Sequence, residues 1–288
     1  MCIMNYVDII EFWQSQNITT ENELSASLNS YCIDFAYHSG KIENDNITYH
    51  DTREIFDKNG VTSYTGDLRT LYEIQNSKDA YEEILTAFGT RQIIDETFLK
   101  RIHKLLTKNT YDTRRYQLGE RPGEYKLHDY VTDREEVGAL PEDVQEEMSE
   151  LLSELIDIED KHALTAAAYF HAKLENIHPF ADGNGRTGRL LMNYFLLLHN
   201  HPPIVIHEEN RKEYYAALEQ HDKALDISTL VAFLKKELEL TWEKSLMKKS
   251  EKKKNNRSLK DLLTEAEDTF IQNSEKDIAH KHDELYER

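Results

Sequence analysis

One short run near the middle of the chain, residues 178–189, combines side chains that phosphate chemistry requires. It reads His-Pro-Phe-Ala-Asp-Gly-Asn-Gly-Arg-Thr-Gly-Arg. His178 can accept a proton near neutral pH, which is the property of a general base. Asp182 offers a hard oxygen ligand for Mg²⁺, which proteins typically hold through one or two carboxylates plus substrate phosphates. The run therefore pairs a candidate base with a candidate metal ligand.

The second half of the run is suited to binding phosphate. Gly183 and Gly185 lie in a turn whose successive amides form a concave anion site. The apolar stretch 190–198 follows at once and predicts a buried helix, whose first N–H groups and dipole attract anions. Arg186 and Arg189 add forked donors that match phosphate oxygens. Together these residues predict phosphate-linked group transfer.

The same run resembles, at every defining position, the motif of the Fic family, His-x-Phe-x-(Asp/Glu)-Gly-Asn-Gly-Arg-x-x-Arg. The resemblance extends more loosely over residues 30–235. It implies the transfer of AMP from ATP to a hydroxyl of a protein, with Mg²⁺. It implies that His178 deprotonates the attacking hydroxyl and that Asp182 holds the metal. It assigns the ATP phosphates to Gly183, Asn184, Gly185, Arg186 and, at the terminal phosphate, Arg189.

A second match to this family lies upstream, in the sequence Ser-Gly-Lys-Ile-Glu-Asn at 39–44. It is similar to the inhibitory pattern (Ser/Thr)-x-x-x-Glu-(Gly/Asn). The resemblance implies that Glu43 pairs with Arg189 and denies that arginine to the γ-phosphate of ATP, while Ser39 holds the inhibitory helix in place. A carboxylate in an arginine fork imitates a phosphate oxygen, which agrees with this interpretation. The alternative is an ordinary solvated helix end.

Two further segments are similar to family elements around the motif. The stretch 123–131 is β-like and lies where the family has a hairpin flap that holds the target by main-chain pairing. The flap residues so identified are Gly123, Glu124, Tyr125 and Lys126. The stretch 211–218 resembles the helix that borders the nucleotide base, where Tyr214 or Tyr215 would pack on adenine. The alternatives are an ordinary surface hairpin and a tyrosine pair shared between core and rim.

A rival metal site can be drawn on the helix that precedes the motif. His171, Glu175 and His178 are spaced i, i+4 and i+7, which places them on one helical face where they could ligate a metal. Pro179 marks the end of that helix, however, so His178 should turn away from this face. We therefore favour a packed or hydrogen-bonded role for His171.

The composition predicts an all-α bundle, and the resemblance implies a bundle of the Fic type with a small β-hairpin flap. Only 10 Gly and 5 Pro interrupt 288 residues, which suits helices joined by short loops. Apolar residues recur at helical spacing, for example between Val144 and Leu155. We expect three parts: residues 1–60 with the inhibitory helix, 61–240 as the catalytic core, and 241–288 as a charged linker and C-terminal helix.

The charge and cysteine counts narrow the classes of function. The chain carries 35 basic and 54 acidic residues, a net charge of −19. This argues against a general nucleic-acid binder, because such binding rests on neutralising phosphates. Two cysteines cannot form a disulfide framework, and they fit a reducing compartment. No segment has the pattern of a signal peptide or the length of a membrane span. We expect a cytoplasmic protein that does not engage membranes.

Two classes of function remain open. The first is a protein adenylyltransferase that uses ATP and Mg²⁺ and is held back by its own N-terminal helix. Its partner would be a target protein with a Ser, Thr or Tyr hydroxyl, or another copy of itself, and homo-oligomers stay open. Enzymes of the family that move another donor group or remove AMP belong to the same class. The second class is a non-catalytic, nucleotide-responsive interaction module. The intact His178 and Asp182 favour the enzyme.

Overall fold

The computed structural model describes residues 5–62, 64–130 and 138–255, with the side chains of 244–255 outside the description. The chain divides into two compact units, residues 1–241 and residues 242–288. Every site residue predicted from the sequence belongs to the first unit. The helix expected beyond residue 257 lies outside the described residues.

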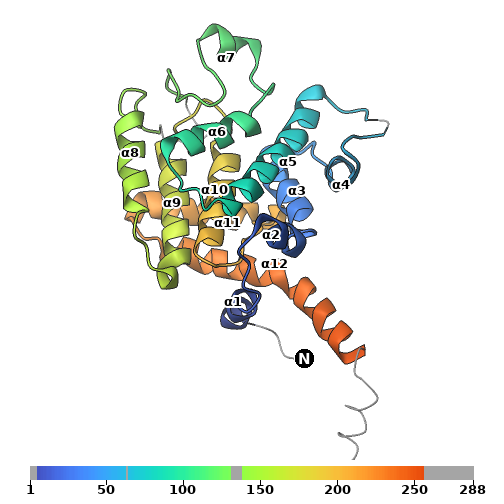
Figure 1. The fold of residues 1–288 in the computed structure, drawn as a ribbon. Helices are drawn as coiled ribbons and strands as arrows, with labels where there is room; N and C mark the ends of the chain where they lie inside the picture. Colours follow the sequence, from blue (N-terminus) through green and yellow to red (C-terminus); the bar gives the residue numbers. More distant parts are fainter. Residues whose placement is uncertain (1–4, 63, 131–137, 256–288) are drawn as a thin grey trace, which may run out of the picture. The chain divides into compact units, whose positions relative to one another are not determined.

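Helices are the only regular secondary structure in the described residues, so the predicted all-α fold class is confirmed (Figure 1). Two short 3₁₀ turns, η1 (Asp160–His162) and η2 (Glu208–Asn210), stand before α9 and α11. In chain order the α-helices are α1 (Tyr6–Gln14), α2 (Glu21–Ser27), α3 (Tyr31–Glu43), α4 (Tyr49–Lys58), α5 (Leu68–Gly89), α6 (Glu96–Leu106), α7 (Thr113–Gln117), α8 (Val144–Glu154), α9 (Ala163–Ile177), α10 (Asn184–Leu198), α11 (Arg211–Ala224) and α12 (Ser228–Asn255).

Short acidic side chains fix where two of the site's helices begin. Asp67 accepts a hydrogen bond from the N–H of Thr70 at the start of α5. Asp95 accepts one from the N–H of Phe98 at the start of α6. Such N-caps satisfy amides that have no acceptor within the helix. Because α5 and α6 both carry side chains to the motif, their caps help to set the register of the site.

The core of the first unit is built around α9 and α10, which lie side by side (Figure 1). The apolar run 190–198 is confirmed as a buried helix segment, since it forms the body of α10. Both α5 and α6 pack on α10. The ring centroids of Phe98 in α6 and Tyr194 in α10, for example, lie 5.2 Å apart. A helix that is apolar on all sides must be enclosed. The loop that leads into α10 therefore starts from a fixed scaffold.

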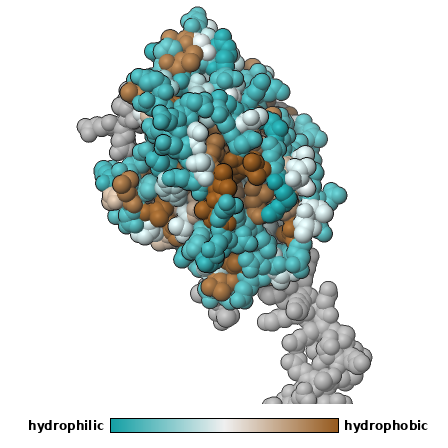
Figure 2. All heavy atoms as spheres, turned by 60° about the vertical axis from the view of Figure 1, so that its left-hand side comes forward, coloured by the Kyte–Doolittle hydropathy of each residue, from teal (hydrophilic) through white to brown (hydrophobic). Residues whose placement is uncertain are grey.

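One face of the molecule is largely polar (Figure 2). Figure 2 shows one face on which hydrophilic side chains predominate and hydrophobic ones gather near the middle. In the part of the chain that the structure describes, no helix combines the length and the apolar composition that crossing a membrane requires.

Two segments differ from expectation. Residues 123–130 of the predicted flap form turns and bends rather than a strand, and residues 131–137 lie outside the described residues. The hairpin therefore stays a prediction. The basic run 248–257, expected as a linker, continues α12 as far as Asn255. Lysine and glutamate are good helix formers, which explains why the helix persists through the charges.

Candidate active site

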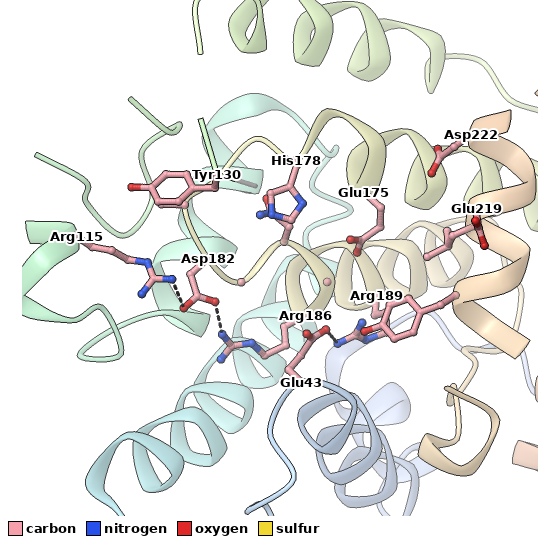
Figure 3. Close-up of a pocket in the computed structure, with 16 residues that line it drawn as sticks. Glu43, Arg115, Tyr130, Glu175, His178, Asp182, Arg186, Arg189, Glu219 and Asp222 are labelled. Atoms are coloured by element: carbon pink, nitrogen blue, oxygen red, sulfur yellow. Dashed lines mark hydrogen bonds and ion pairs between the residues drawn. The ribbon is translucent and has the colours of Figure 1, made fainter. Parts of the chain in front are cut away.

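The motif forms the loop between α9 and α10, and two left-handed backbone positions shape it. His178 ends α9 with φ 51° and ψ 60°, a conformation uncommon outside glycine. Gly183 precedes α10 with φ 84°, a backbone conformation that favours glycine. A Cβ at this position would also lie 2.5 Å from the Thr107 side chain, so there is no room for a larger residue. These turns bring the His178 imidazole and the start of α10 to one cavity (Figure 3).

The Asn184 side chain closes this loop rather than reaching toward a ligand. Its Oδ1 accepts the N–H of Phe180 at 2.9 Å, and its Nδ2 donates to the carbonyl of Phe180 at 2.8 Å. Phe180 is fully buried. The phosphate role expected for Asn184 is therefore limited to its main-chain amide, because the side-chain amide is committed to the loop.

His103 of α6 joins the motif loop to the predicted flap. Its Nδ1 accepts the N–H of Gly123 at 2.9 Å, so the ring hydrogen is on Nε2, which donates to the Asp182 carbonyl at 2.8 Å. The ring also stacks on Phe180 with 3.6 Å between centroids. Burial lowers the pKa of His103 to about 4, so the imidazole is neutral at physiological pH and keeps both hydrogen bonds.

The first turn of α10 is open to an anion. The helix begins at Asn184 without a side-chain cap, so its first amides lack the acceptor that a cap would provide. Arg186 is 4% exposed, and its Nε and Nη1 make no hydrogen bond within the described residues. A buried guanidinium with unfilled donors beside an uncapped helix start is suited to a phosphate group.

Asp182 lies beside this turn, and guanidinium groups surround its carboxylate (Figure 3). Its Oδ2 accepts from Nη2 of Arg69 at 2.9 Å and lies 3.7 Å from Nη2 of Arg115. Its Oδ1 lies 3.4 Å from Nη2 of Arg186. A lone carboxylate next to an amide-rich turn fits a divalent cation whose other ligands are phosphate oxygens and water. Among the described residues, no group of three or more His, Cys, Asp or Glu side chains could hold a metal by itself.

Arg189 is a buried charge that is paired with α3. It is 1% exposed. Its Nη2 donates to a carboxylate oxygen of Glu43 at 2.7 Å and to the Ser39 carbonyl at 2.9 Å, and its Nε donates to the Ser39 hydroxyl at 3.0 Å. Burial alone would lower the pKa of Arg189, but Glu43 and other neighbours outweigh it and raise that pKa. The structure thus brings together the three residues of the predicted inhibitory contact.

The His178 imidazole points into the cavity between Asp182 and Glu175 (Figure 3). Burial lowers the pKa of His178 below its ordinary 6.5, and the nearby Lys126 ammonium lowers it further. A hydrogen bond from the ring to the backbone of Glu175 stabilises the protonated form, but it is outweighed by the effects that lower the pKa. The neutral imidazole is the form that can accept a proton, so the surroundings prepare His178 to act as a base.

The cavity has a volume of about 670 Å³. One side is formed by the motif loop and α10, another by Tyr130, and α11 contributes Tyr215. Tyr214 is 0% exposed. Its hydroxyl forms a hydrogen bond with Nε2 of His171 at 2.7 Å, and the same hydroxyl oxygen lies 3.5 Å from Nη1 of Arg189. Of the two tyrosines predicted to pack on adenine, only Tyr215 reaches the cavity, whereas Tyr214 is a core residue that supports Arg189.

The predicted flap residues dock on the motif through the main chain. The N–H of Lys126 donates to the Pro179 carbonyl at 2.9 Å, in addition to the contact of Gly123 with the α6 histidine. Gly123 has φ 87°, which favours glycine. Tyr125 packs against the motif phenylalanine at 5.5 Å, while Glu124 is exposed. One edge of this segment is therefore anchored beside the site.

The rival metal site is not assembled in the described residues. His171 is fully buried and bonded to a tyrosine hydroxyl, and its Nδ1 lies 4.0 Å from Oε1 of Glu175. Burial raises the pKa of Glu175 to about 7, which disfavours the charged form that a metal would need. His178 has turned into the left-handed conformation that ends α9. His171 is a packed and hydrogen-bonded residue.

Sequence reasoning missed several residues that the structure brings to the site. Arg69 of α5 and Arg115 of α7 reach Asp182 from segments without a motif, so no local signal marks them. Two carboxylates of α11 line the cavity at positions i+4 and i+7 from Tyr215. This spacing places them on the same helical face as Tyr215, so the sequence could have indicated that they lie near the same cavity. These are Glu219 and Asp222.

Comparison with known proteins indicates the same family as the motif. The model of the Fic/DOC family matches residues 93–196. The chain is 30% identical over 205 residues to Protein adenylyltransferase Fic of Nematostella vectensis, and 31% identical over 209 residues to the protein of that name of Aedes aegypti. The aligned parts are 69% and 70% of this chain but 45% and 39% of those proteins. The chain thus spans less than half the length of these relatives.

Solved structures share the fold. A Fic domain containing signaling protein from Bacteroides thetaiotaomicron aligns with a TM-score of 0.69 and 25% identity, over 83% of this chain and 94% of that one. A segment of Fic-1 from C. elegans aligns with a TM-score of 0.69 and 23% identity, over 85% and 71% of the two chains, which is a likeness of fold. Fold and site define an all-α protein built around a helix start suited to phosphate. The chain belongs to the Fic family.

Proposed function

We propose that this chain is a protein adenylyltransferase, which moves AMP from ATP to a hydroxyl side chain of a protein. One observation carries the proposal: the His178 imidazole, the uncapped start of α10 and the buried Arg186 guanidinium converge on a single cavity. The names of the curated relatives support the same activity.

In the proposed reaction the target hydroxyl attacks the α-phosphorus of ATP. The hydroxyl proton passes to His178 while a new O–P bond forms. The bond between the α-phosphorus and the bridging oxygen breaks, and pyrophosphate leaves with the electron pair. General-base help of this kind contributes roughly 10²–10⁴-fold to the rate. The first amides of α10 and the Arg186 guanidinium stabilise charge that develops on the phosphoryl oxygens.

Asp182 is the residue that would hold Mg²⁺ in this scheme. When bound, the ion neutralises and orients phosphate oxygens. The adenine is proposed to lie against Tyr215, and the target segment along residues 123–126. The buried Tyr214 would act indirectly, through Arg189, rather than by touching the base.

The contacts of α3 support autoinhibition as part of the proposal. Glu43 and Ser39 together occupy Nε and Nη2 of Arg189. While these bonds hold, that face of the guanidinium is closed to the terminal phosphate of ATP. Release of the Glu43 carboxylate is then the step that gives Arg189 to the nucleotide.

The test is the transfer of label from ATP that carries ³²P at either the α- or the γ-phosphate. We expect Glu43→Gly to become labelled, or to label a target, from the α position alone. Label from the γ position would instead indicate phosphate transfer, and no label from either would favour the non-catalytic module. His178→Ala in the Glu43→Gly background should lose roughly 10²–10⁴-fold in rate while still binding ATP by calorimetry. Release of AMP from previously labelled protein would indicate the removal activity.

A further inference from the structure

The carboxylate of Asp182 is held by an arginine that belongs to no motif. Arg69 of α5 donates from Nη2 to Oδ2 of Asp182 at 2.9 Å. The other two guanidinium groups near this carboxylate lie farther away, Arg186 at 3.4 Å and Arg115 at 3.7 Å. Arg69 therefore makes the shortest of the three guanidinium contacts to the carboxylate that would hold the metal ion.

The Arg69 side chain has one anchored end and one end that can be displaced. Its Nε donates to Oε1 of Glu73 at 3.0 Å, one turn along α5. The Glu73 side chain is 5% exposed, and its Oε2 accepts from Nδ2 of Asn44 at 2.7 Å, so Glu73 is itself fixed. The Arg69 side chain is 46% exposed. It can leave Asp182 for solvent without leaving Glu73.

A divalent cation and Arg69 require the same lone pairs. Mg²⁺ and Mn²⁺ bind proteins through carboxylate oxygens, and the guanidinium donates to one of the two oxygens that Asp182 offers. A second positive charge beside the ion also opposes its binding. Arg186 approaches the same two carboxylates, Asp182 at 3.4 Å and Glu73 at 3.7 Å. It differs from Arg69 because it is buried and its Nε and Nη1 make no hydrogen bond within the described residues, whereas Arg69 uses Nε and Nη2 on these carboxylates at 3.0 and 2.9 Å.

We propose that Arg69 is a displaceable counter-ion of Asp182 that competes with the divalent cation and so sets how much metal the protein requires. The inference rests on the proposed function, in which Asp182 holds the metal. It assigns Arg69 a regulating role at the metal position rather than a contact with the nucleotide.

The test measures metal affinity directly, by electron paramagnetic resonance of free Mn²⁺ titrated into the full chain with α,β-methylene-ATP, which cannot donate AMP. Arg69→Gln should lower the Mn²⁺ dissociation constant by roughly three- to tenfold, the range expected when a partly exposed charged hydrogen bond is removed. Arg53→Gln is the matched control. Arg53 forms the same kind of i, i+4 pair through Nε, with Asp57 at 3.2 Å, and is 65% exposed on α4. It should leave the Mn²⁺ dissociation constant unchanged.

Two outcomes overturn the proposal. An unchanged or raised Mn²⁺ dissociation constant in Arg69→Gln would show that Arg69 does not compete with the metal. Weaker binding of α,β-methylene-ATP in EDTA, without tighter Mn²⁺ binding, would make Arg69 a phosphate ligand instead. Asp182→Ala separates this failure from failure of the proposed function. If Asp182→Ala keeps the wild-type Mn²⁺ affinity, the metal role of Asp182 itself is wrong. If it loses that affinity while Arg69→Gln equals wild type, only the competition is wrong.

Discussion

At the scale of single residues, the proposed chemistry depends on the protonation state of His178. Its pKa lies below the ordinary 6.5 because the ring is largely buried. Only the neutral form can accept the hydroxyl proton, and a lowered pKa keeps that form populated to lower pH. We expect kcat/KM of Glu43→Gly to be level above about pH 6.5 and to fall only as the pH drops through the lowered pKa. A profile that already falls between about pH 8 and about pH 7 would contradict this.

Lys126 provides a separate test of the same environment. It is 2% exposed, its Nζ has no hydrogen-bond partner within the described residues, and its charge contributes to the low pKa of His178. Removing a like charge favours the protonated imidazole, so Lys126→Met should move the acid limb of the pH profile to higher pH. Lys236→Met, which removes an exposed lysine paired with Glu213, is the control and should leave the limb in place.

Residues differ in how far their role could be predicted from sequence. His178 and Arg189 stand in one short run, so their shared task is visible locally. Arg69 and Arg115 reach Asp182 only because α5 and α7 pack near the motif loop. An arginine on a charged helix gives no periodic or compositional signal of such a contact. The resemblance assigns Asn184 to the phosphates, but the residue type alone does not reveal the two bonds of its side chain to the loop backbone.

At the scale of elements, α3 is held against α10 by separable contacts. Glu43→Gly removes the shortest contact to Arg189, and we expect AMP transfer to rise by roughly tenfold or more, since the Glu43 side chain is 35% exposed and the pair is partly screened. Ser39→Ala should activate less, because the Ser39 carbonyl still accepts from Nη2 of Arg189. Incorporation of α-labelled ATP at equal protein concentration measures both effects.

Two variants control for this prediction. Asp45→Gly removes an exposed carboxylate two residues beyond Glu43 that pairs with Arg211 rather than Arg189, and should not activate. Arg189→Ala should abolish transfer even in the Glu43→Gly background, because the guanidinium proposed to bind the terminal phosphate of ATP is then missing. Equal labelling of wild type and Glu43→Gly would show that residues 39–44 are an ordinary helix end without an inhibitory role.

Elements were predictable where their signals are local. The buried body of α10 follows from an apolar run, and the end of α9 follows from the proline after His178. The approach of α3 to α10 joins residues far apart in the chain, so periodicity could not reveal it and only the resemblance suggested it. The flap was inferred from β-like composition and from its place in the family resemblance. Short β-like segments also form turns, as residues 123–130 do.

At the scale of the whole molecule, the net charge of −19 should influence which target segments bind. A strongly negative protein attracts positive and repels negative partners over about one Debye length. We expect a target peptide with Lys residues flanking its hydroxyl to show a lower KM than the same peptide with flanking Glu. The ratio of the two KM values should shrink as salt rises from about 50 mM to about 500 mM, because the Debye length falls. If the ratio of KM values did not depend on salt, the preference between the peptides would arise from specific contacts rather than from the net charge.

The two carboxylate oxygens of Glu73 contact opposite sides of the site. Oε2 accepts from Asn44, directly after α3, while Oε1 accepts from Arg69, which holds the proposed metal ligand, and lies 3.7 Å from Nη1 of Arg186. Because Arg69 keeps its Nε bond to Glu73 when Nη2 leaves Asp182, a link between this displacement and the release of α3 has to run through a shift of the shared Glu73 carboxylate. Such thermodynamic linkage is reciprocal. The factor by which release of α3 changes metal affinity then equals the factor by which bound metal changes release of α3. Under that linkage and the proposed function, the free magnesium concentration would adjust the resting fraction of inhibited protein, in addition to supplying the ion that the proposed chemistry uses.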